Sequence, residues 1–379
     1  MNIWKVTKKY EVWLGRFINL LKADLRLKHQ NMASDVFVFL RATYYWWALI
    51  WRRVCPDLAN APVVLAVGDL HVENFGSWFD RLRRWIWGIN DVDEAYPLPY
   101  TNDLLRLGTS AILALDSNRL KQLTPEAACQ TILDGYRAGM ESGGKPFVLA
   151  EHPQLKRLLN KNKRNPQAFW TKMQDLAREG KLRGKDVPAR VLAALESLLP
   201  NRKLKLRIFH RPVGEGSLGR KRFTGLTMTN GSPFAVEAKA LAPSASVFAR
   251  GGKSQQSYYM QILRQAVRCQ DPYVQVVRRQ ILRKVGPEYL RIELNTLTQL
   301  KDERLLLWCM GFETANFHLG TSGAQAAVLA DLNERPATWL VDNAKKMANK
   351  MHKGRSKFAK RLARTKVPPV PNTVQLQAD

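Results

Sequence analysis

The stretch Gly68-Asp69-Leu70-His71-Val72-Glu73-Asn74 is followed, after an aromatic run, by Asn90-Asp91-Val92-Asp93-Glu94. The apolar run at 61–67 predicts a buried strand that ends where the first glycine lets the backbone turn. A second apolar run, at 85–89, ends directly at the second stretch. If the two runs pair as a hairpin, the two acidic loops lie side by side and can reach one ion.

The order of the polar residues in these loops matches a known catalytic pattern. In protein kinases an Asp accepts the proton of the substrate hydroxyl, an Asn five residues later binds Mg²⁺, and a later Asp holds the metal that bridges the nucleotide phosphates. Asp69, Asn74 and Asp91 fit these three roles. Mg²⁺ prefers oxygen ligands and keeps several waters, so one amide oxygen, one carboxylate and substrate phosphates suffice. Asp and Asn residues after strands often form ordinary turns, which is enough to explain either motif alone. The presence of both motifs in series favours the catalytic interpretation.

A glycine-rich turn lies much further along the chain, at 213–219. The flanking residues 204–210 and 220–228 both have the pattern of strands, and the turn exposes backbone N–H groups to a phosphate. After a further turn signal, the run 234–239 predicts a third strand that ends in a lysine. In a kinase small lobe, such a glycine loop and lysine hold the nucleotide phosphates, whereas an isolated turn of this kind is often a flexible hairpin. The expected phosphate-binding residues are Gly214, Gly216, Ser217, Gly219 and Lys239.

Taken together, the motifs resemble a bacterial family known as domain of unknown function 2252. The resemblance rests on G-D-L-H-x-E-N-F-G, N-D-x-D-E-A, N-D-L-x-R-L, R-x-V-G-x-G-S-x-G and V-x-A-K, and it extends over roughly residues 28–325. The first loop is also similar to the G-D-x-H-x-x-N motif of aminoglycoside and choline phosphotransferases, which are kinase-like enzymes. This resemblance implies catalysis by Asp69 and metal binding by Asn74 and Asp91. It implies no acceptor, because the family is itself uncharacterised.

The order of the motifs differs from that of an ordinary kinase, in which the glycine loop and its lysine precede the catalytic loop. We therefore expect an α+β, protein-kinase-like two-lobed fold in permuted order, with the small sheet lobe after the catalytic loops in sequence. The expected segments are an N-terminal helical segment at 1–60, a catalytic-loop and helical lobe at 61–200, a small glycine-loop sheet lobe at 201–245, a helical remainder at 246–340 and a basic C-terminal tail at 341–379. Within the remainder, helices are expected at 256–267, 272–283 and 304–318.

Three further residues are expected to support the loops: His71, Asp93 and Asp103. His71 and Glu73 have the spacing of a zinc deaminase pair, but the P-C-x-x-C that this chemistry requires is absent. We therefore expect the histidine to orient the loop and Glu73 to pair with an arginine. Asp103 either buttresses the catalytic loop, as in the phosphotransferases that it resembles, or caps the helix that follows it.

Two departures from the family pattern leave a second interpretation open. Val92 stands where an aromatic residue is usual, and no acidic residue follows Lys239 directly. Neither change removes an expected ligand, but a pseudokinase that binds nucleotide without transferring phosphate is an alternative. The glutamates that could pair with the lysine come later, at Glu288, Glu293 and Glu303.

The composition favours anionic partners. Of 379 residues, 60 are Lys or Arg and 32 are Asp or Glu, which gives a formal charge of +28, and 45% are hydrophobic, enough for a large core. Much of the charge lies at 345–366, either a solvated end or a site for an anionic partner such as nucleic acid or lipid. The apolar run at 44–50 is expected to be a buried helix and not a membrane anchor. The cysteines lack metal-ligand spacing and indicate reduced thiols of a cytoplasmic protein: Cys55, Cys129, Cys269 and Cys309.

The sequence therefore predicts a kinase-like phosphotransferase that uses ATP and Mg²⁺ to phosphorylate an unidentified acceptor. The alternative is an inactive nucleotide-binding pseudokinase or a basic protein that binds nucleic acid or lipid. The enzyme interpretation requires Lys239 to lie across a nucleotide-sized gap from Asp91, although the two are far apart in the sequence.

Overall fold

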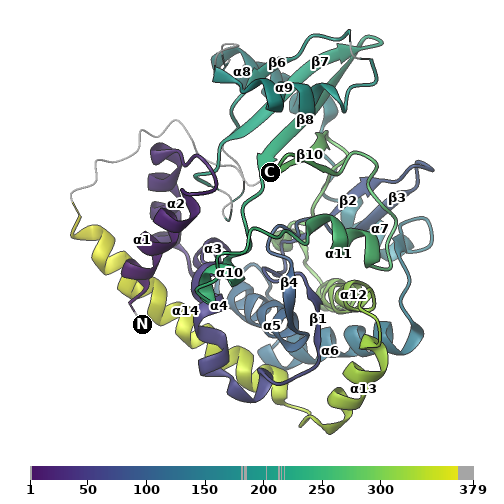
Figure 1. Ribbon diagram of the computed structural model, residues 1–379. Helices are drawn as coiled ribbons and strands as arrows, with labels where there is room; N and C mark the ends of the chain where they lie inside the picture. Colours follow the sequence, from purple (N-terminus) through teal and green to yellow (C-terminus); the bar gives the residue numbers. More distant parts are fainter. Residues whose placement is uncertain are drawn as a thin grey trace.

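A computed structural model describes residues 2–180, 182, 186–201, 203–211, 214, 216 and 218–365. Ser217, which the sequence assigns to phosphate binding, and residues 366–379 of the expected tail lie outside the described residues. Helices and small antiparallel sheets form an α+β fold, which is the class predicted. A five-stranded sheet lies at one end of the molecule, and a larger, mainly helical body makes up the rest (Figure 1).

The first part of the chain is helical, as predicted. It contains α1 (Ile3–Leu14), α2 (Lys22–Ser34), α3 (Val36–Ala42), α4 (Tyr44–Val54) and the 3-10 helix η1 (Pro56–Leu58). Asp35 begins α3 by accepting a hydrogen bond from the Val38 N–H at 2.8 Å, which satisfies one of the unpaired donors of the first turn. Trp47 and Trp51 are fully buried, so α4 is a core helix.

Two small sheets carry the acidic loops. One consists of β1 (Val63–Ala66) and β4 (Tyr96–Pro99), and the other of β2 (Phe75–Phe79), β3 (Trp85–Ile89) and β5 (Phe147–Val148). The expected hairpin between the runs at 61–67 and 85–89 is therefore wrong. The aromatic segment β2 lies between them and pairs with β3 through a short turn, because adjacent strands pair more readily than distant ones.

The helical body is built on long, closely packed helices. They are α5 (Thr101–Asp116), α6 (Pro125–Ser142), α7 (Pro153–Asn160), α12 (Leu300–His318), α13 (Ala324–Glu334) and α14 (Trp339–Ala363). Glycines allow α6 and α12 to approach each other: a Cβ on Gly135 would lie 2.0 Å from the Trp308 carbonyl oxygen, and one on Gly311 would lie 2.0 Å from that of Ile132. Smaller elements between β8 and α12 are α10 (Ala245–Ala249), α11 (Tyr259–Gln265) and the 3-10 helix η4 (Leu294–Thr296).

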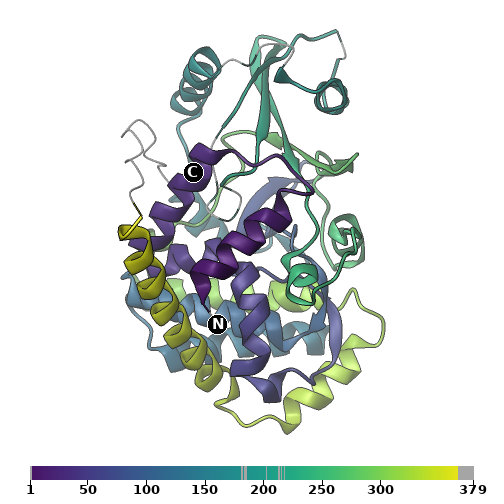
Figure 2. The same ribbon diagram turned by 60° about the vertical axis from the view of Figure 1, so that its left-hand side comes forward.

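Helix α14 contains most of the segment that the sequence assigns to a basic tail. It lies along α1 and α2 on one flank of the molecule (Figures 1 and 2). Its inner face is apolar, and Met347, Met351 and Phe358 are fully buried. Among the described helices, none combines the length and the apolar composition needed to cross a membrane. The four cysteines are free thiols, and all except Cys269 are buried.

The larger sheet is antiparallel throughout, with the strand order β6-β7-β8-β10-β9. Its strands are β6 (Arg207–Phe209), β7 (Arg222–Thr229), β8 (Ser232–Ala240), β9 (Gln275–Val277) and β10 (Gln280–Val285). The helix expected at 272–283 is therefore wrong, because this segment forms the β9–β10 hairpin. Arg278 and Arg279 both have positive φ, 46° and 65°, which is the two-residue turn that suits the twist of paired strands.

Two helices cover opposite faces of this sheet. Helix α9 (Ala189–Glu196) packs on the face that carries Val236 and Ala238, and α8 (Pro166–Glu179) packs on the face that carries Ala235. Because side chains alternate along a strand, Glu237 and Lys239 lie on the same face as Ala235. Beyond the end of α8, Lys239 on this face contacts Asp91 and Asp93 of the second acidic loop.

Candidate functional site

A cavity of about 240 Å³ lies between the sheet and the helical body. Most of the predicted site residues line it: Asp69, His71, Asn74, Asp91, Asp93, Gly214, Gly216 and Lys239. A Cβ placed on Gly216 would lie 3.3 Å from the Arg41 carbonyl oxygen and 3.9 Å from Asp69 Oδ2, so this glycine lies close to the first acidic loop. Gly219 instead packs on α2, where a Cβ would lie 2.5 Å from Leu25 Cδ2.

The backbone turn before Asp69 requires glycine. Gly68 has φ of 83°, and a Cβ there would lie 2.5 Å from the Glu94 carbonyl oxygen. Asp103, which is fully buried, accepts the N–H of Val67 at 2.6 Å and that of Gly68 at 3.0 Å. Helix α5 has Tyr100 as its N-cap. The Asp103 carboxylate therefore holds the end of β1 in place and does not cap its own helix.

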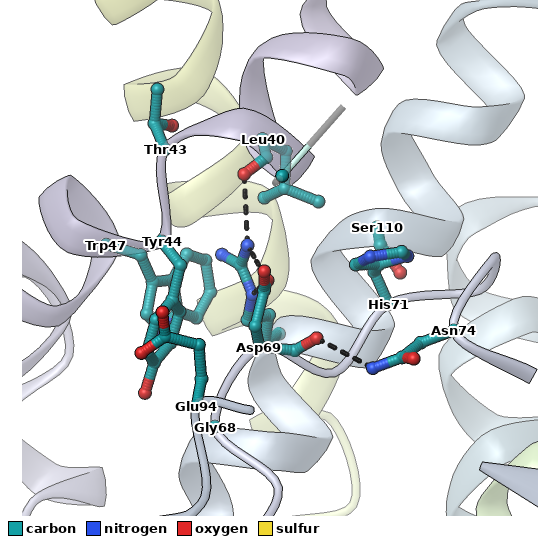
Figure 3. A network of polar contacts seen from close by, with 12 residues as sticks. Leu40, Thr43, Tyr44, Trp47, Gly68, Asp69, His71, Asn74, Glu94 and Ser110 are labelled. Atoms are coloured by element: carbon teal, nitrogen blue, oxygen red, sulfur yellow. Dashed lines mark hydrogen bonds and ion pairs between the residues drawn. The ribbon is translucent and has the colours of Figure 1, made fainter. Parts of the chain in front are cut away.

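Asp69 is paired with Arg106, a residue for which the sequence predicts no role. Arg106 is fully buried, and its Nε donates to Asp69 Oδ1 at 2.7 Å, while its Nη2 donates to the Leu40 carbonyl oxygen at 3.0 Å. Figure 3 labels the two acceptor residues, Leu40 and Asp69. Its guanidinium lies 5.0 Å from the ring centres of both Tyr44 and Trp47. Arg106 stands in the N-D-L-x-R-L motif three residues after Asp103, on the same face of α5, so the sequence contains a signal for it.

The environment of Asp69 sets its proton affinity. Burial raises the pKa of this carboxyl above its ordinary value, and the Arg106 guanidinium acts in the opposite direction. Asp93 and Asp91 add smaller contributions that raise the pKa. The result is a carboxylate of fixed orientation that accepts a proton more readily than an exposed aspartate.

Asn74 joins the two acidic loops. Its side-chain nitrogen donates to the Asp69 carbonyl oxygen at 3.1 Å (Figure 3). The same nitrogen donates to the Asp91 carbonyl oxygen at 2.9 Å. The Asn90 N–H in turn donates to the Asn74 carbonyl oxygen at 3.2 Å. The loops therefore meet even though the strands before them do not pair. Since the amide nitrogen is used for these bonds, the amide oxygen is the atom that remains able to bind a cation.

Lys239 reaches the second acidic loop from β8. Its Nζ lies 2.8 Å from Asp93 Oδ2 and 3.4 Å from Asp91 Oδ2. Arg220 Nη1 also lies 2.8 Å from Asp93. Burial alone would raise the pKa of Asp93, but Lys239 and Arg220 hold it well below its ordinary value. Lys239 thus takes two aspartates as partners.

The later glutamates have other partners. Glu288 pairs with Lys284 at 2.6 Å, and Glu303 accepts the Lys121 N–H at 2.7 Å. Glu293 lies 4.0 Å from Arg291. One of these glutamates was expected to pair with Lys239, but none of these contacts involves that lysine.

A buried arginine cluster next to Lys239 was not anticipated. Glu237, two residues before Lys239 on β8, is fully buried and pairs with Arg211 at 3.0 Å, with Arg283 at 2.8 Å and with Arg222. Arg283 is opposite Glu237 in the strand register, and Arg222 is opposite Lys239. Burial would raise the pKa of Glu237, but the three arginines hold it well below its ordinary value. All three arginines line the cavity, which makes this part of its wall cationic.

His71 and Glu73 complete the first loop. The Glu73 N–H donates to His71 Nδ1 at 3.2 Å, and burial lowers the pKa of the histidine well below its ordinary value, assisted by Arg41, Arg106 and Arg291. His71 is therefore neutral and orients the loop. Glu73 pairs with Arg41, as expected of an acid among arginines. Within the described part of the chain, no three His, Cys, Asp or Glu residues group as metal ligands.

Comparison with known proteins finds a family match. A family described as "Uncharacterized protein conserved in bacteria (DUF2252)" matches residues 20–194. No curated protein and no solved structure matches the chain, so the expected likeness to kinase-like phosphotransferases gains no support from these comparisons. The segment similar to DUF2252 contains both acidic loops and Arg106, and it ends before the glycine-rich turn and Lys239.

Proposed function

We propose that the protein is a phosphotransferase that uses Mg-ATP to phosphorylate an acceptor, in a kinase-like arrangement of permuted order. One observation carries the proposal: Lys239 and Asp91 are 148 positions apart in the sequence but line the same cavity. They meet there in a direct ion pair of 3.4 Å and not across the nucleotide-sized gap that the sequence predicts, so a bound phosphate would have to take the place of this contact. The same cavity contains Asp69 and Asn74. A base, two oxygen ligands for a cation and a phosphate-pairing lysine are the parts that phosphoryl transfer needs.

In the proposed reaction, the acceptor hydroxyl oxygen forms a bond to the γ-phosphorus of ATP. The bond between that phosphorus and the β–γ bridging oxygen breaks, and ADP leaves with its electron pair. The hydroxyl proton passes to the Asp69 carboxylate. The raised pKa of Asp69 and its fixed orientation on Arg106 suit this role.

One residue from each acidic loop suits a magnesium ion. Asn74 would offer its amide oxygen and Asp91 its carboxylate, which is 45% exposed, while phosphate oxygens and water would complete the shell. When bound, the ion neutralises charge on the phosphates. Lys239 would then share its charge between Asp93 and the phosphates, and the turn at Gly214 and Gly216 would cover them.

The test compares nucleotide binding with turnover. We expect Mg-ATP to raise the Tm of the purified protein and to be hydrolysed slowly without an acceptor. Asp69→Asn should abolish turnover and keep the Tm shift, whereas Lys239→Met should weaken the shift. The exposed Asp57→Asn and Lys350→Met are matched controls that should behave as the wild type.

Two results would count against the enzyme. A wild-type protein whose Tm does not respond to Mg-ATP has no nucleotide site of this kind. Full turnover in Asp69→Asn would show that Asp69 is not the base. Nucleotide binding without any turnover would favour the pseudokinase alternative, and a ligand affinity that follows ionic strength alone would favour a basic binding protein.

A further inference from the structure

The cavity carries more positive charge than a nucleotide needs. Ten arginine and lysine side chains and six carboxylates line it among the described residues. Mg²⁺ neutralises much of the charge of a bound nucleotide, so Mg-ATP leaves part of this surplus uncompensated. A second anion is the ligand that such a wall favours.

Part of the surplus lies on the Asp69 side of the cavity. Arg41 comes from α3, Arg164 precedes α8, and Arg291 follows β10, and all three line the cavity together with Asp69. We call them the acceptor-side arginines. Three elements that are distant in sequence converge here, so the cluster is a product of the fold.

Glu73 is the carboxylate around which two of these arginines gather, and the third lies near Glu293. Arg41 pairs with Glu73, and Arg291 Nη1 lies 3.9 Å from Glu73 Oε2. Arg291 Nη2 lies 4.0 Å from Glu293 Oε1, and Arg164 is close enough to act on the same carboxylate. Of the two glutamates, Glu73 is the one that lines the cavity. Glu73 is also on the loop that carries Asp69, four positions further along.

One arginine of the cluster, Arg41, has a hydrogen-bond donor without a partner among the described residues. The Nε of Arg41 is buried and has no hydrogen-bond partner within the described part of the chain. A buried donor without a partner costs stability. Arg41 also lines the cavity, where its guanidinium can meet a ligand oxygen. The planar fork of an arginine matches the oxygens of a phosphate or a carboxylate.

We propose that the acceptor is itself anionic, and that the acceptor-side arginines bind its phosphate or carboxylate group while its hydroxyl faces Asp69. The inference rests on the proposed function, because the role of Asp69 identifies this side of the cavity as the one for the acceptor. The acceptor class is then a phosphorylated or carboxylated hydroxy compound and not a neutral sugar or alcohol.

The test uses simple anions as probes. With a saturating non-hydrolysable Mg-ATP analogue present, inorganic phosphate or acetate should bind the wild type saturably, measured as a Tm shift. Arg291→Gln and Arg164→Gln should each weaken this binding by roughly tenfold or more, the loss of one charge-assisted contact. Arg190→Gln, an exposed arginine on α9, is the matched control. Whichever of the two probes binds more tightly identifies the anionic group.

The outcomes separate this inference from the proposed function. Equal affinity in the wild type and both variants, absence of saturable binding, or competition between the anion and the nucleotide would each overturn the acceptor site. If the anion binds through Arg291 but no nucleotide binds, the anion site stands and the phosphotransferase fails. If nucleotide binding and Asp69 behave as proposed while the anion does not bind, only the acceptor class is overturned.

Discussion

At the scale of single residues, the pairing of Asp69 with Arg106 dominates the chemistry of the site. The arginine is fully buried, donates to the carboxylate and to Leu40, and lies against two aromatic rings. A buried ion pair contributes little net stability while it is intact, but loss of one partner leaves an uncompensated charge. The pair therefore constrains both the stability of the protein and the proton affinity of its candidate base.

Arg106→Gln should lower the free energy of unfolding by about 3 kcal/mol, because it removes the partner of a largely buried carboxylate. The measurement is urea denaturation at neutral pH, with Arg190→Gln as the control on an exposed helix face. A loss below about 0.5 kcal/mol, the range of ordinary surface substitutions, would show that the pair carries no such constraint.

The pH dependence of turnover should report Asp69. A base must be ionised to accept a proton, so turnover falls as the pH drops through its pKa, which burial places above the ordinary aspartate value. Arg106 opposes this rise, so Arg106→Gln should move the acidic limb of the pH–rate profile to higher pH. The profile of kcat/KM measures this, and an unchanged acidic limb in the variant would contradict it.

At the scale of elements, α12 positions the second acidic loop through β3. Glu313 on α12 accepts the Ile89 N–H at 3.2 Å and the Asn316 side-chain N–H at 2.8 Å, directly before the loop begins. A Cβ on Gly88 would lie 2.2 Å from Glu313 Oε1, so glycine is required opposite this carboxyl. Burial raises the pKa of Glu313 to about 7.

The raised pKa of Glu313 predicts how the free energy of unfolding depends on pH. The folded state holds the Glu313 proton up to about pH 7, whereas the unfolded chain releases it near its ordinary value of 4.5. The contribution of Glu313 to stability should therefore fall as the pH rises between these two values and stay level above them. The side chain in Glu313→Gln cannot ionise. The unfolding free energy of this variant, relative to that of the wild type, should therefore rise by at least about 1 kcal/mol between pH 5 and pH 8. A constant difference would mean that Glu313 titrates normally.

The packing of α14 gives a second prediction at this scale. Gly354 lies against the core, and a Cβ there would lie 2.3 Å from Trp46 Cη2. Alanine raises helix propensity by about 1 kcal/mol, but overpacking costs about 1–3 kcal/mol. We expect Gly354→Ala to lower the Tm and the exposed Lys357→Ala to leave it unchanged. A higher Tm for Gly354→Ala would mean that α14 is held more loosely than its contacts indicate.

At the scale of the whole molecule, net charge opposes the compact state. A formal charge of +28 gives mutual repulsion among side chains that salt screens. Raising NaCl from about 50 to 500 mM should therefore raise the Tm, since the Debye length falls well below the spacing of distant charges. A Tm that falls with salt would show that attractive ion pairs outweigh this repulsion.

The sequence by itself determined the local features of the site. The acidic loops, the glycine-rich turn and the strands that end near Lys239 follow from residue order, because turn chemistry and side-chain alternation act over a few positions. The α+β class and the helical first part of the chain also follow from such patterns. Each of these depends on neighbours in the chain.

The tertiary structure decided the partners. Pairing of β1 with β4, the strands at 275–285, the contact of Lys239 with Asp93, and the arginines around Glu237 all join segments that local patterns do not relate. Strand pairing depends on which edges are available after the core has formed, and a buried charge takes whichever opposite charge the packing brings near. Arg106 combines both kinds of information. Its motif can be found in the local sequence, but its contact with Asp69 forms only when α5 packs under the loop.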